Sequence, residues 1–406
     1  MTNTTATAHI DDALARRNAL VLAAAQAFGG ASAPIVIGTG GLAGWFLLGD
    51  DKSLSTLPVT TFVVGMALGT VPAAMLMHRI GRRLGFQIGA LSTMAGGIIA
   101  AYGVLTGTFW LLCLGTGFSG VGNAFVQQYR FAAADTASAG FRPKAISWVL
   151  AGGVVTGVVG PQVVIFSKDL LAPIPFAGAF LAQVGLGLTT IVILSFLRIP
   201  RPPRAEVTGA EIRPVHQVAA QPKFVVAVLC GIVSYGLMSL VMTASPLAMI
   251  DCDLTETQAM LGIQWHVIAM FAPSFFTGTL IARYGKEPVI AAGLFLLVAS
   301  SLVALSGITL AHFWFALVLL GVGWNFGFIG ATSLVADTYR PEERGRMQAT
   351  NDFLIFGFQA LASLGSGMVL AVWGWEAVNF IVFPFSALAL AMLIWLRRTS
   401  RGQVAA

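Results

Sequence analysis

Apolar residues occupy most of the chain in long runs, which charged or turn-forming residues interrupt at short intervals. A helix needs about 20 apolar residues to cross the hydrocarbon core of a bilayer, whereas a β-barrel would need many short alternating strands. The runs therefore indicate a bundle of membrane-spanning helices. The sequence predicts twelve helices, over residues 18–48, 57–77, 84–105, 109–134, 145–166, 176–197, 224–250, 258–282, 289–305, 312–336, 347–373 and 378–396.

A polar stretch rich in arginine and proline divides these helices into two groups of six. The two basic residues before the first run, Arg16 and Arg17, would also suit a signal peptide, but the run that follows is too long for a signal core. We therefore expect an uncleaved first helix. The predicted organisation is a cytoplasmic N-terminus over 1–17, a first six-helix bundle over 18–197, a cytoplasmic linker over 198–223, a second six-helix bundle over 224–396 and a cytoplasmic tail over 397–406.

The composition agrees with a membrane environment. Of the 406 residues, 57% are hydrophobic and 10% are charged, whereas about 25% are charged in typical soluble domains. The 46 glycines suit a helical bundle, because small residues let helices approach closely in lipid. Cys113, Cys230 and Cys252 are scattered, without CxxC or histidines at metal-ligand spacing, so neither a disulfide framework nor a metal site nor a cofactor is predicted.

Basic residues gather in alternate loops and near both chain ends, which explains the excess of 23 Lys and Arg over 17 Asp and Glu without a nucleic-acid partner. By the positive-inside rule, both termini and the linker are expected in the cytoplasm, with the chain as a multi-pass protein of the cell inner membrane. The opposite loops hold only Lys52 and Lys168 beside Asp50, Asp51, Asp169, Asp251, Asp253, Glu256 and Glu376.

The two halves resemble one another at an offset of roughly two hundred residues. The loop at 78–83 reads HRIGRR and the loop at 282–287 reads ARYGKE, while LGTG at 114–117 matches LGVG at 320–323. The fourth and tenth helices end in Ala-Asp-Thr, at Asp135 and Asp337. Such an internal repeat is typical of transporters whose binding site lies between two bundles.

The loop after the second helix resembles the signature of the major facilitator superfamily, G-x-L-x-D-R-x-G-R-R/K. Residues 74–83 read AMLMHRIGRR, with alanine for the first glycine and His78 for the aspartate, and residues 278–286 repeat the pattern as GTLIARYGK. The resemblance covers residues 18–396. It implies an all-α membrane protein with twelve transmembrane helices in two pseudo-symmetric six-helix bundles, which is the major facilitator fold, and transport by alternating access.

The same resemblance implies that loop cations pair with the acids that end the fourth and tenth helices. These latches would join Arg82 to Asp135 and Lys286 to Asp337, the alternative being solvated loop charges. The gating candidates in these loops are Arg79, Arg82, Asp135, Arg283, Lys286 and Asp337.

A further gating contact is predicted from His78, which replaces a family aspartate that caps the eleventh helix. We expect Asp352 in the first turn of that helix, where it would pair with a protonated His78 and close the cytoplasmic gate at acid pH. The alternative is a solvated His78 and a helix-terminal charge at Asp352.

The fourth helix carries a polar stripe at i, i+3 and i+4 spacing: Thr116, Gly120, Asn123, Gln127 and Arg130. A polar stripe in lipid must face protein or water, and the family resemblance implies that this helix lines the central cavity. In the alternative, Arg130 reaches the lipid headgroups or pairs with Asp135.

The second half supplies amide and aromatic side chains but few charges. Such a lining suits a neutral or weakly anionic solute, in particular a flat heteroaromatic one. His266 is expected to be a structural hydrogen-bonding residue. The substrate-binding candidates of both halves are Asn123, Gln127, Arg130, Tyr235, Gln264, Trp324, Asn325 and Gln359.

Residues 127–135, QQYRFAAAD, resemble bacterial vitamin importers of the superfamily, including riboflavin transporters. We therefore expect a monomeric secondary transporter in contact with membrane lipid that takes up a small organic solute. Protons are the default coupling ion, and uncoupled diffusion is the alternative. No nucleophile triad or phosphate-binding loop supports an enzyme or an ATP-driven pump.

Two other functions stay open. Gly157 to Pro161 match half of the family's antiporter motif, which favours drug or metabolite efflux, although Val164 and Ile165 stand where that motif has glycines. A membrane receptor or scaffold that has kept the fold is the alternative from another class.

Overall fold

The computed structural model describes residues 12–135, 137–138, 141–199 and 213–404, and every regular element in them is a helix. Much of the predicted N-terminal segment (1–11) and of the linker (200–212) lies outside the described residues, as do 405–406. The elements are α1 (Asp12–Gly29), α2 (Ser32–Leu47), α3 (Leu57–Ile80), α4 (Arg82–Leu105), α5 (Phe109–Val126), α6 (Tyr129–Asp135), α7 (Arg142–Ser167), α8 (Ala177–Leu194), α9 (Val215–Ala219), α10 (Pro222–Asp251), α11 (Glu256–Phe271), α12 (Ser274–Tyr284), α13 (Lys286–Leu305), α14 (Leu310–Val335), the 3-10 turn η1 (Pro341–Glu343), α15 (Arg344–Phe380) and α16 (Val382–Val404).

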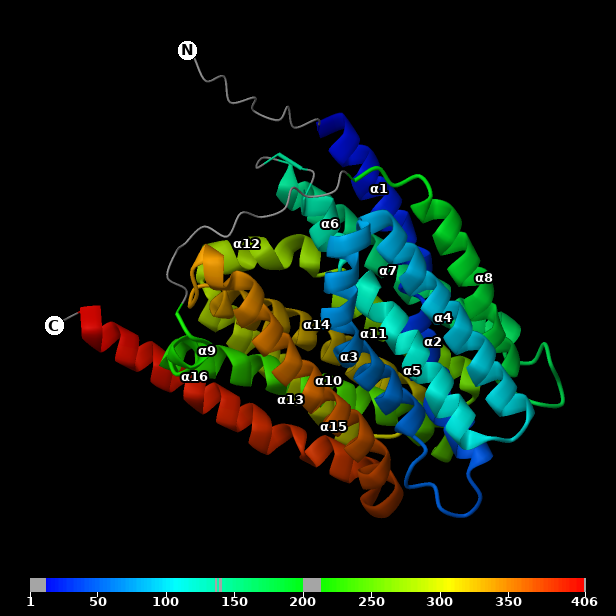
Figure 1. Cartoon of the computed structure of the whole chain (residues 1–406). Coiled ribbons are helices and arrows are strands. Elements are labelled where there is room, and N and C mark those ends of the chain that lie inside the picture. The colour runs from blue at the N-terminus through cyan, green and yellow to red at the C-terminus, as the bar shows by residue number, and fades with distance from the viewer. Residues whose placement is uncertain (1–11, 136, 139–140, 200–212, 405–406) are drawn as a thin grey trace, which may run out of the picture.

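These elements agree with the twelve predicted membrane crossings. Ten helical stretches of the described residues are long and apolar enough to cross a bilayer, and α11 with α12 forms one more, bent by 41°. One of the ten stretches, Arg344–Thr399, is 56 residues long and crosses twice, because the chain reverses after the non-helical Gly374 (Figure 1). The predicted helical membrane fold is therefore confirmed.

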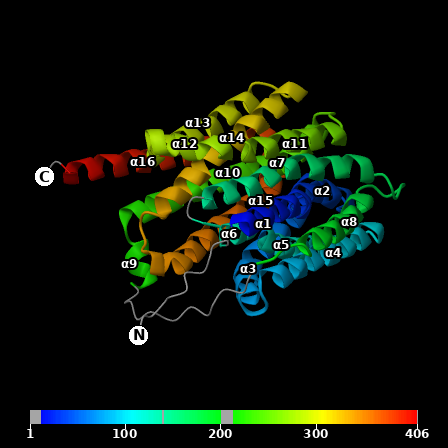
Figure 2. The ribbon, with the colours of Figure 1, turned by 90° about the horizontal axis from the view of Figure 1, so that it is seen from above.

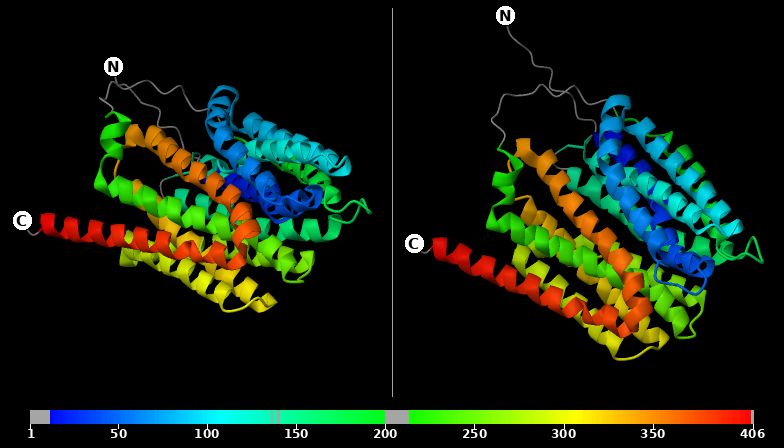
Figure 3. Two further views of the ribbon diagram at one scale, coloured as in Figure 1. Left: turned by 90° about the horizontal axis from the view of Figure 1, so that it is seen from below. Right: turned by 60° about the horizontal axis from the view of Figure 1, so that its bottom comes forward.

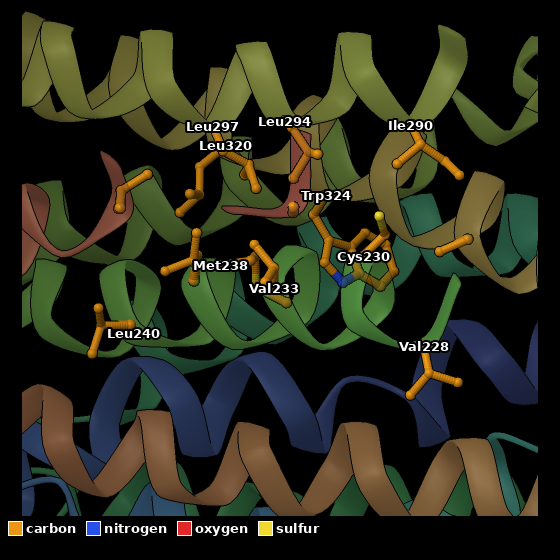
Figure 4. Packing of buried hydrophobic residues seen from close by; sticks show 14 of the residues in the cluster. Val228, Cys230, Val233, Met238, Leu240, Ile290, Leu294, Leu297, Leu320 and Trp324 are labelled. Carbon is orange, nitrogen blue, oxygen red and sulfur yellow. The ribbon is translucent and has the colours of Figure 1, made fainter. Parts of the chain in front are cut away.

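The crossings form two groups that lie side by side. In Figure 3, α1 to α8 gather on one side of the molecule, while α10 and α13 to α16 gather on the other. Buried apolar clusters fill each half. In the second half, Met238 of α10, Leu297 of α13 and Leu320 of α14 meet in one cluster, as Figure 4 shows.

Charge distinguishes the two ends of the bundle. We call the end with the exposed Arg79, Arg83, Arg142, Arg344 and Arg346 the basic end; α1 begins there, and α3, α6 and α12 end there. We call the opposite end, with the exposed Asp50, Asp51, Asp169, Asp251 and Asp253, the acidic end. Figure 2 shows the bundle turned by 90° about the horizontal axis, with the long helices running between these ends.

The two similar loops adopt the same backbone conformation. Gly81, between α3 and α4, has φ 95° and ψ 160°, and Gly285, between α12 and α13, has φ 90° and ψ 168°. Only glycine takes such angles without strain. The internal repeat seen in the sequence therefore exists as a structural repeat.

Close helix contacts place α5 against α3. A Cβ atom on Gly120 would lie 2.0 Å from the carbonyl oxygen of Phe62, and one on Gly65 would lie 2.1 Å from the carbonyl oxygen of Gly117. The helices can therefore approach only through glycine, as is common in membrane bundles. This crossing fixes the position of α5, which carries part of the candidate site.

Candidate functional site

A row of three neighbouring cavities leads from the basic end into the space between the halves. The outermost, with a volume of about 700 Å³, is called here the vestibule. Its residues come from the ends of α3, α6 and α14 and the beginnings of α7 and α15. Its polar lining consists of Thr70, Gln128, Arg130, Asp135, Arg142, Thr332, Tyr339, Arg344, Gln348, Asn351 and Asp352.

Further in lie a passage of about 40 Å³ and an inner chamber of about 90 Å³. Arg130 lines both vestibule and passage, while Gln127 and Phe271 line both passage and inner chamber. The polar and aromatic residues of the inner chamber come from both halves and are Gln26, Phe62, Asn123, Gln127, Thr156, Tyr235, Phe271 and Gln359.

Three helices that the sequence predicts as continuous are interrupted beside these cavities. The breaks separate α1 from α2, α5 from α6, and α11 from α12. Gly30, Gln127 and Phe271, at or beside the breaks, line the inner chamber. Irregular backbone in membrane transporters is tolerated where it lines a cavity, so the breaks favour this region as the candidate binding site.

Side chains from neighbouring helices hydrogen-bond to backbone carbonyl groups beside two of these breaks. The Thr156 hydroxyl of α7 donates a hydrogen bond to the carbonyl oxygen of Gln26 (2.7 Å), which also accepts one from the backbone N–H of Gly30 (2.9 Å). The Asn325 amide donates to the carbonyl oxygen of Met270 (2.6 Å) and accepts from the hydroxyl of Thr277 (2.6 Å). The breaks are thus stable parts of the fold.

Arg130 lies at the centre of this row of cavities. Its Nε is buried without a hydrogen-bond partner in the described residues, and its guanidinium lies 4.8 Å from the ring centroid of Phe131. Asp352 and Tyr235, from the second half, are close enough to interact with it electrostatically. The alternative pairing with Asp135 is wrong for this structure, since that carboxylate binds Arg82.

Several candidates have other contacts. Asn325 is fully buried and bound to the α11–α12 break, and none of the cavities described includes it, so its role in solute binding stays a prediction. Gln264 accepts a hydrogen bond from Gln162 of the first half (2.8 Å), and none of the cavities described includes it. Trp324 is 7% exposed and stacks on Phe328 beneath Tyr235 rather than lining a cavity.

The predicted stripe on the fourth helix divides in two. Thr116 hydrogen-bonds to the Thr61 hydroxyl of α3 (2.8 Å), and Gly120 packs on the α3 backbone. Only Asn123, Gln127 and Arg130 reach the cavities. The reason is that α3 covers one end of the stripe.

Both predicted latch contacts are present. Arg82 Nη2 lies 2.7 Å from Asp135 Oδ2, and Lys286 Nζ lies 2.5 Å from Asp337 Oδ1. Lys223, at the start of α10, makes a second ion pair with Asp337 (2.9 Å). Burial acts to raise the pKa of Asp337, but hydrogen bonds from the two lysines outweigh it and lower the pKa below its ordinary value.

The remaining gating candidates, Arg79, Arg283, Asp352 and His78, belong to neither latch. Arg79 and Arg283 are exposed, and among the described residues neither forms an ion pair. Asp352 is not in a first turn as predicted, because α15 begins at Arg344, and its carboxylate accepts a hydrogen bond from Asn351. His78 is exposed and outside the vestibule lining, so its contact with Asp352 is absent here and stays a prediction for another conformation.

An ion pair that the sequence did not predict lies where the linker ends, between Arg213 and Glu343. Glu343, whose side chain is only 3% exposed, accepts two hydrogen bonds of 2.6 Å from Arg213 and one from the backbone of Arg340. These bonds, the one from Arg213 first, lower the pKa of Glu343 to about 2. In the first half, Asp12 likewise accepts hydrogen bonds from Ser138.

The halves meet at the acidic end. An apolar cluster there joins Ile35 and Val36 of α2 to Leu247 of α10 and Met260 of α11. Polar contacts across the halves are Thr60 to Ser363 (3.4 Å), Gln162 to Gln264 (2.8 Å) and Lys168 to Glu256 (2.8 Å). The vestibule therefore lies at the end opposite these contacts.

Comparison with known proteins gives consistent matches along the whole chain. The family model described as Major Facilitator Superfamily matches residues 19–263 and 227–406. The riboflavin transporter RfnT of Brucella anthropi is 48% identical over 399 residues, which cover 97% of this chain and 99% of that protein. The uncharacterized MFS-type transporter YdeG of Bacillus subtilis is 28% identical over 95% of this chain and 93% of its own length.

Two further matches are more distant. Multidrug resistance protein D of Escherichia coli is 26% identical over 138 residues, which cover 33% of this chain and 34% of that protein. Among solved structures, a bacterial homologue of the human lysosomal transporter Spinster superposes with a TM-score of 0.70 at 14% identity, covering 96% of this chain and 98% of that one.

Proposed function

Because the chain belongs to the major facilitator superfamily, as its loop motifs predicted, we propose that it is a secondary transporter of riboflavin or a close flavin relative. The inner chamber carries this proposal, since amide and aromatic side chains from both halves meet there beside three broken helices. Fused heteroaromatic rings suit such a lining, because the rings pack on aromatic walls and the amides bind ring nitrogens and carbonyls. The named relative along nearly the full length supports the same solute.

Efflux is the weaker alternative. The drug exporters to which the chain is similar match only about a third of it. Gly160, in the half-matched antiporter motif, has a packing role, because a Cβ atom there would lie 2.4 Å from Pro34 Cγ of α2. We therefore propose uptake.

The test is uptake of labelled riboflavin by purified protein in proteoliposomes. We expect saturable uptake that unlabelled riboflavin abolishes and that sugars and amino acids leave unchanged. Absence of riboflavin binding and flux, in protein that is folded by its thermal transition, would contradict the proposal.

Proton coupling is proposed to use Asp352. This carboxylate lines the vestibule and is close enough to interact electrostatically with Arg130, which lines both the vestibule and the passage. Replacing Asp352 with asparagine is expected to leave equilibrium exchange of solute intact while removing the dependence of net uptake on an imposed pH gradient. A variant that still responds to the gradient like the wild type would exclude Asp352 as the carrier.

We propose that the basic end faces the cytoplasm, so that both termini lie inside. Single cysteines replacing Asp51 and Asp169 should react with a membrane-impermeant maleimide on intact cells, and cysteines replacing Arg83 and Arg346 should react only after permeabilisation. All four positions are exposed. The background is Cys252→Ser, since the other two native cysteines are buried. The reverse labelling pattern would contradict the proposal and place the acidic end in the cytoplasm.

The latches are proposed to hold the basic end during gating. Reversing either charge in the Arg82–Asp135 pair should slow uptake, and the swapped double variant Arg82→Asp with Asp135→Arg should recover most of the rate. The partly exposed pair contributes only about 0–1 kcal/mol to stability, so the thermal midpoint should change little. The control is Arg83→Asp, an exposed neighbour outside the pair. No recovery in the double variant would remove the latch from the mechanism.

A further inference from the structure

Gln359 presents an unsatisfied acceptor to the inner chamber. It lies on α15, is 5% exposed, and its Oε1 is buried without a hydrogen-bond partner in the described residues. Leaving a buried acceptor unpaired costs about 1–3 kcal/mol. Such a group inside a cavity is therefore expected to receive a hydrogen bond from whatever fills it.

The facing residues come from the first half and are also amides. Gln127 Nε2 donates to Asn123 Oδ1 over 3.4 Å, which is a long and weak hydrogen bond. A ligand carbonyl can compete for these amide donors. The inner chamber thus offers an acceptor on α15 and amide donors on α5 and at its end, on opposite halves of the molecule.

Apart from Gln26 and Thr156, the remaining walls of the chamber are apolar or aromatic. Tyr235 of α10 and Phe271 of α11 are aromatic, and Met66, Met238 and Met270 add deformable thioethers. With a volume of about 90 Å³, the chamber has room for at most one end of a fused ring system, so the rest of such a solute would extend through the passage into the vestibule. A polar side chain on the solute would then lie beside Arg130, Gln128 and Asn351.

We propose that Gln359 determines specificity by accepting a hydrogen bond from the imide N–H of a cyclic imide, while the first-half amides bind the adjacent carbonyl. This inference rests on the proposed flavin transport, and it assigns the pyrimidine-dione end of the ring to the inner chamber and the sugar-alcohol chain to the vestibule. Both halves then hold the same ring edge, so the solute stabilises one arrangement of the halves relative to the other.

The test compares riboflavin with 3-methylriboflavin, in which a methyl group replaces the imide hydrogen. Binding to the purified full-length protein is measured by quenching of flavin fluorescence. The wild type should bind riboflavin at least about tenfold more tightly, because a site built around a hydrogen bond rejects an analogue that lacks it. Gln359→Met, similar in length, should bind riboflavin about tenfold more weakly and no longer distinguish the two compounds.

The matched control is Gln87→Met, which removes an amide that binds the Ser195 hydroxyl within the first half, outside the three cavities, and should keep the discrimination. Thermal midpoints verify that each variant is folded. Discrimination that persists in Gln359→Met would come from steric exclusion of the methyl group and would overturn the inference. Equal binding of both flavins by the wild type would overturn it too, while leaving flavin transport standing. No riboflavin binding by the wild type would overturn both.

Discussion

Replacing Arg130 with alanine is expected to reduce solute affinity and uptake by roughly ten- to a hundredfold. Arg130 lines the vestibule and the passage, and its buried Nε has no partner in the described residues. A hydrogen bond to a charged group contributes about 1.5–3 kcal/mol, and each 1.4 kcal/mol is a factor of ten in affinity. Arg130→Lys should recover little of the loss, because lysine keeps the charge but not the planar fork.

Flavin binding and initial uptake rates check this expectation. Arg142→Ala is the matched control, because Arg142 is exposed at the mouth of the same vestibule. If Arg130→Ala and Arg142→Ala lose activity equally, the loss reflects a general attraction of the solute by positive charge and not a specific contact with Arg130. Wild-type binding and uptake in Arg130→Ala would contradict this role and favour the alternative, in which Arg130 reaches the lipid headgroups.

Gly120→Ala is expected to destabilise the protein strongly, by about 1–3 kcal/mol or more. The new Cβ atom would lie 2.0 Å from the carbonyl oxygen of Phe62, and neither helix backbone can rotate away as a side chain could. The thermal midpoint in detergent and the monodisperse yield should both fall. Because α5 carries Asn123, any folded fraction should also bind solute more weakly.

Gly185→Ala is the control for this variant. Gly185 lies within α8, and no atom lies within 4 Å of its added Cβ atom. Alanine there should be neutral or stabilising, because glycine is about 0.5–1 kcal/mol less favourable than alanine within a helix. Equal thermal midpoints for the two variants would mean that α3 and α5 can separate at little energetic cost.

The sequence predicted the spans and the latches well because both depend on local patterns. Apolar runs mark the crossings, and a glycine that needs a positive φ marks each repeated loop, at Gly81 and Gly285. The ends of the fourth and tenth helices then place Asp135 and Asp337 beside the loop cations. These contacts follow from short segments whose geometry the motif itself sets.

The broken helices could not be predicted in this way. Hydropathy is the same on both sides of a break, and only Gly29-Gly30 and Pro273 gave a local signal. Asn325 was assigned to the cavity because a polar residue in lipid can bind either a solute or a released carbonyl, and only the α11–α12 break decides between these partners. Glu343 was missed because its partner, Arg213, belongs to a linker without a hydropathy pattern.

The apolar cluster at the acidic end has a thermal consequence. Residues of both halves share it, so any opening of that end exposes apolar surface that the present arrangement buries. Exposure of apolar surface raises the heat capacity, which makes the enthalpy and entropy of the step depend on temperature. If this opening limits turnover, an Arrhenius plot of transport should curve even where the bilayer undergoes no phase transition, and the curvature should decrease when cluster residues such as Val36 or Leu247 are replaced by smaller ones.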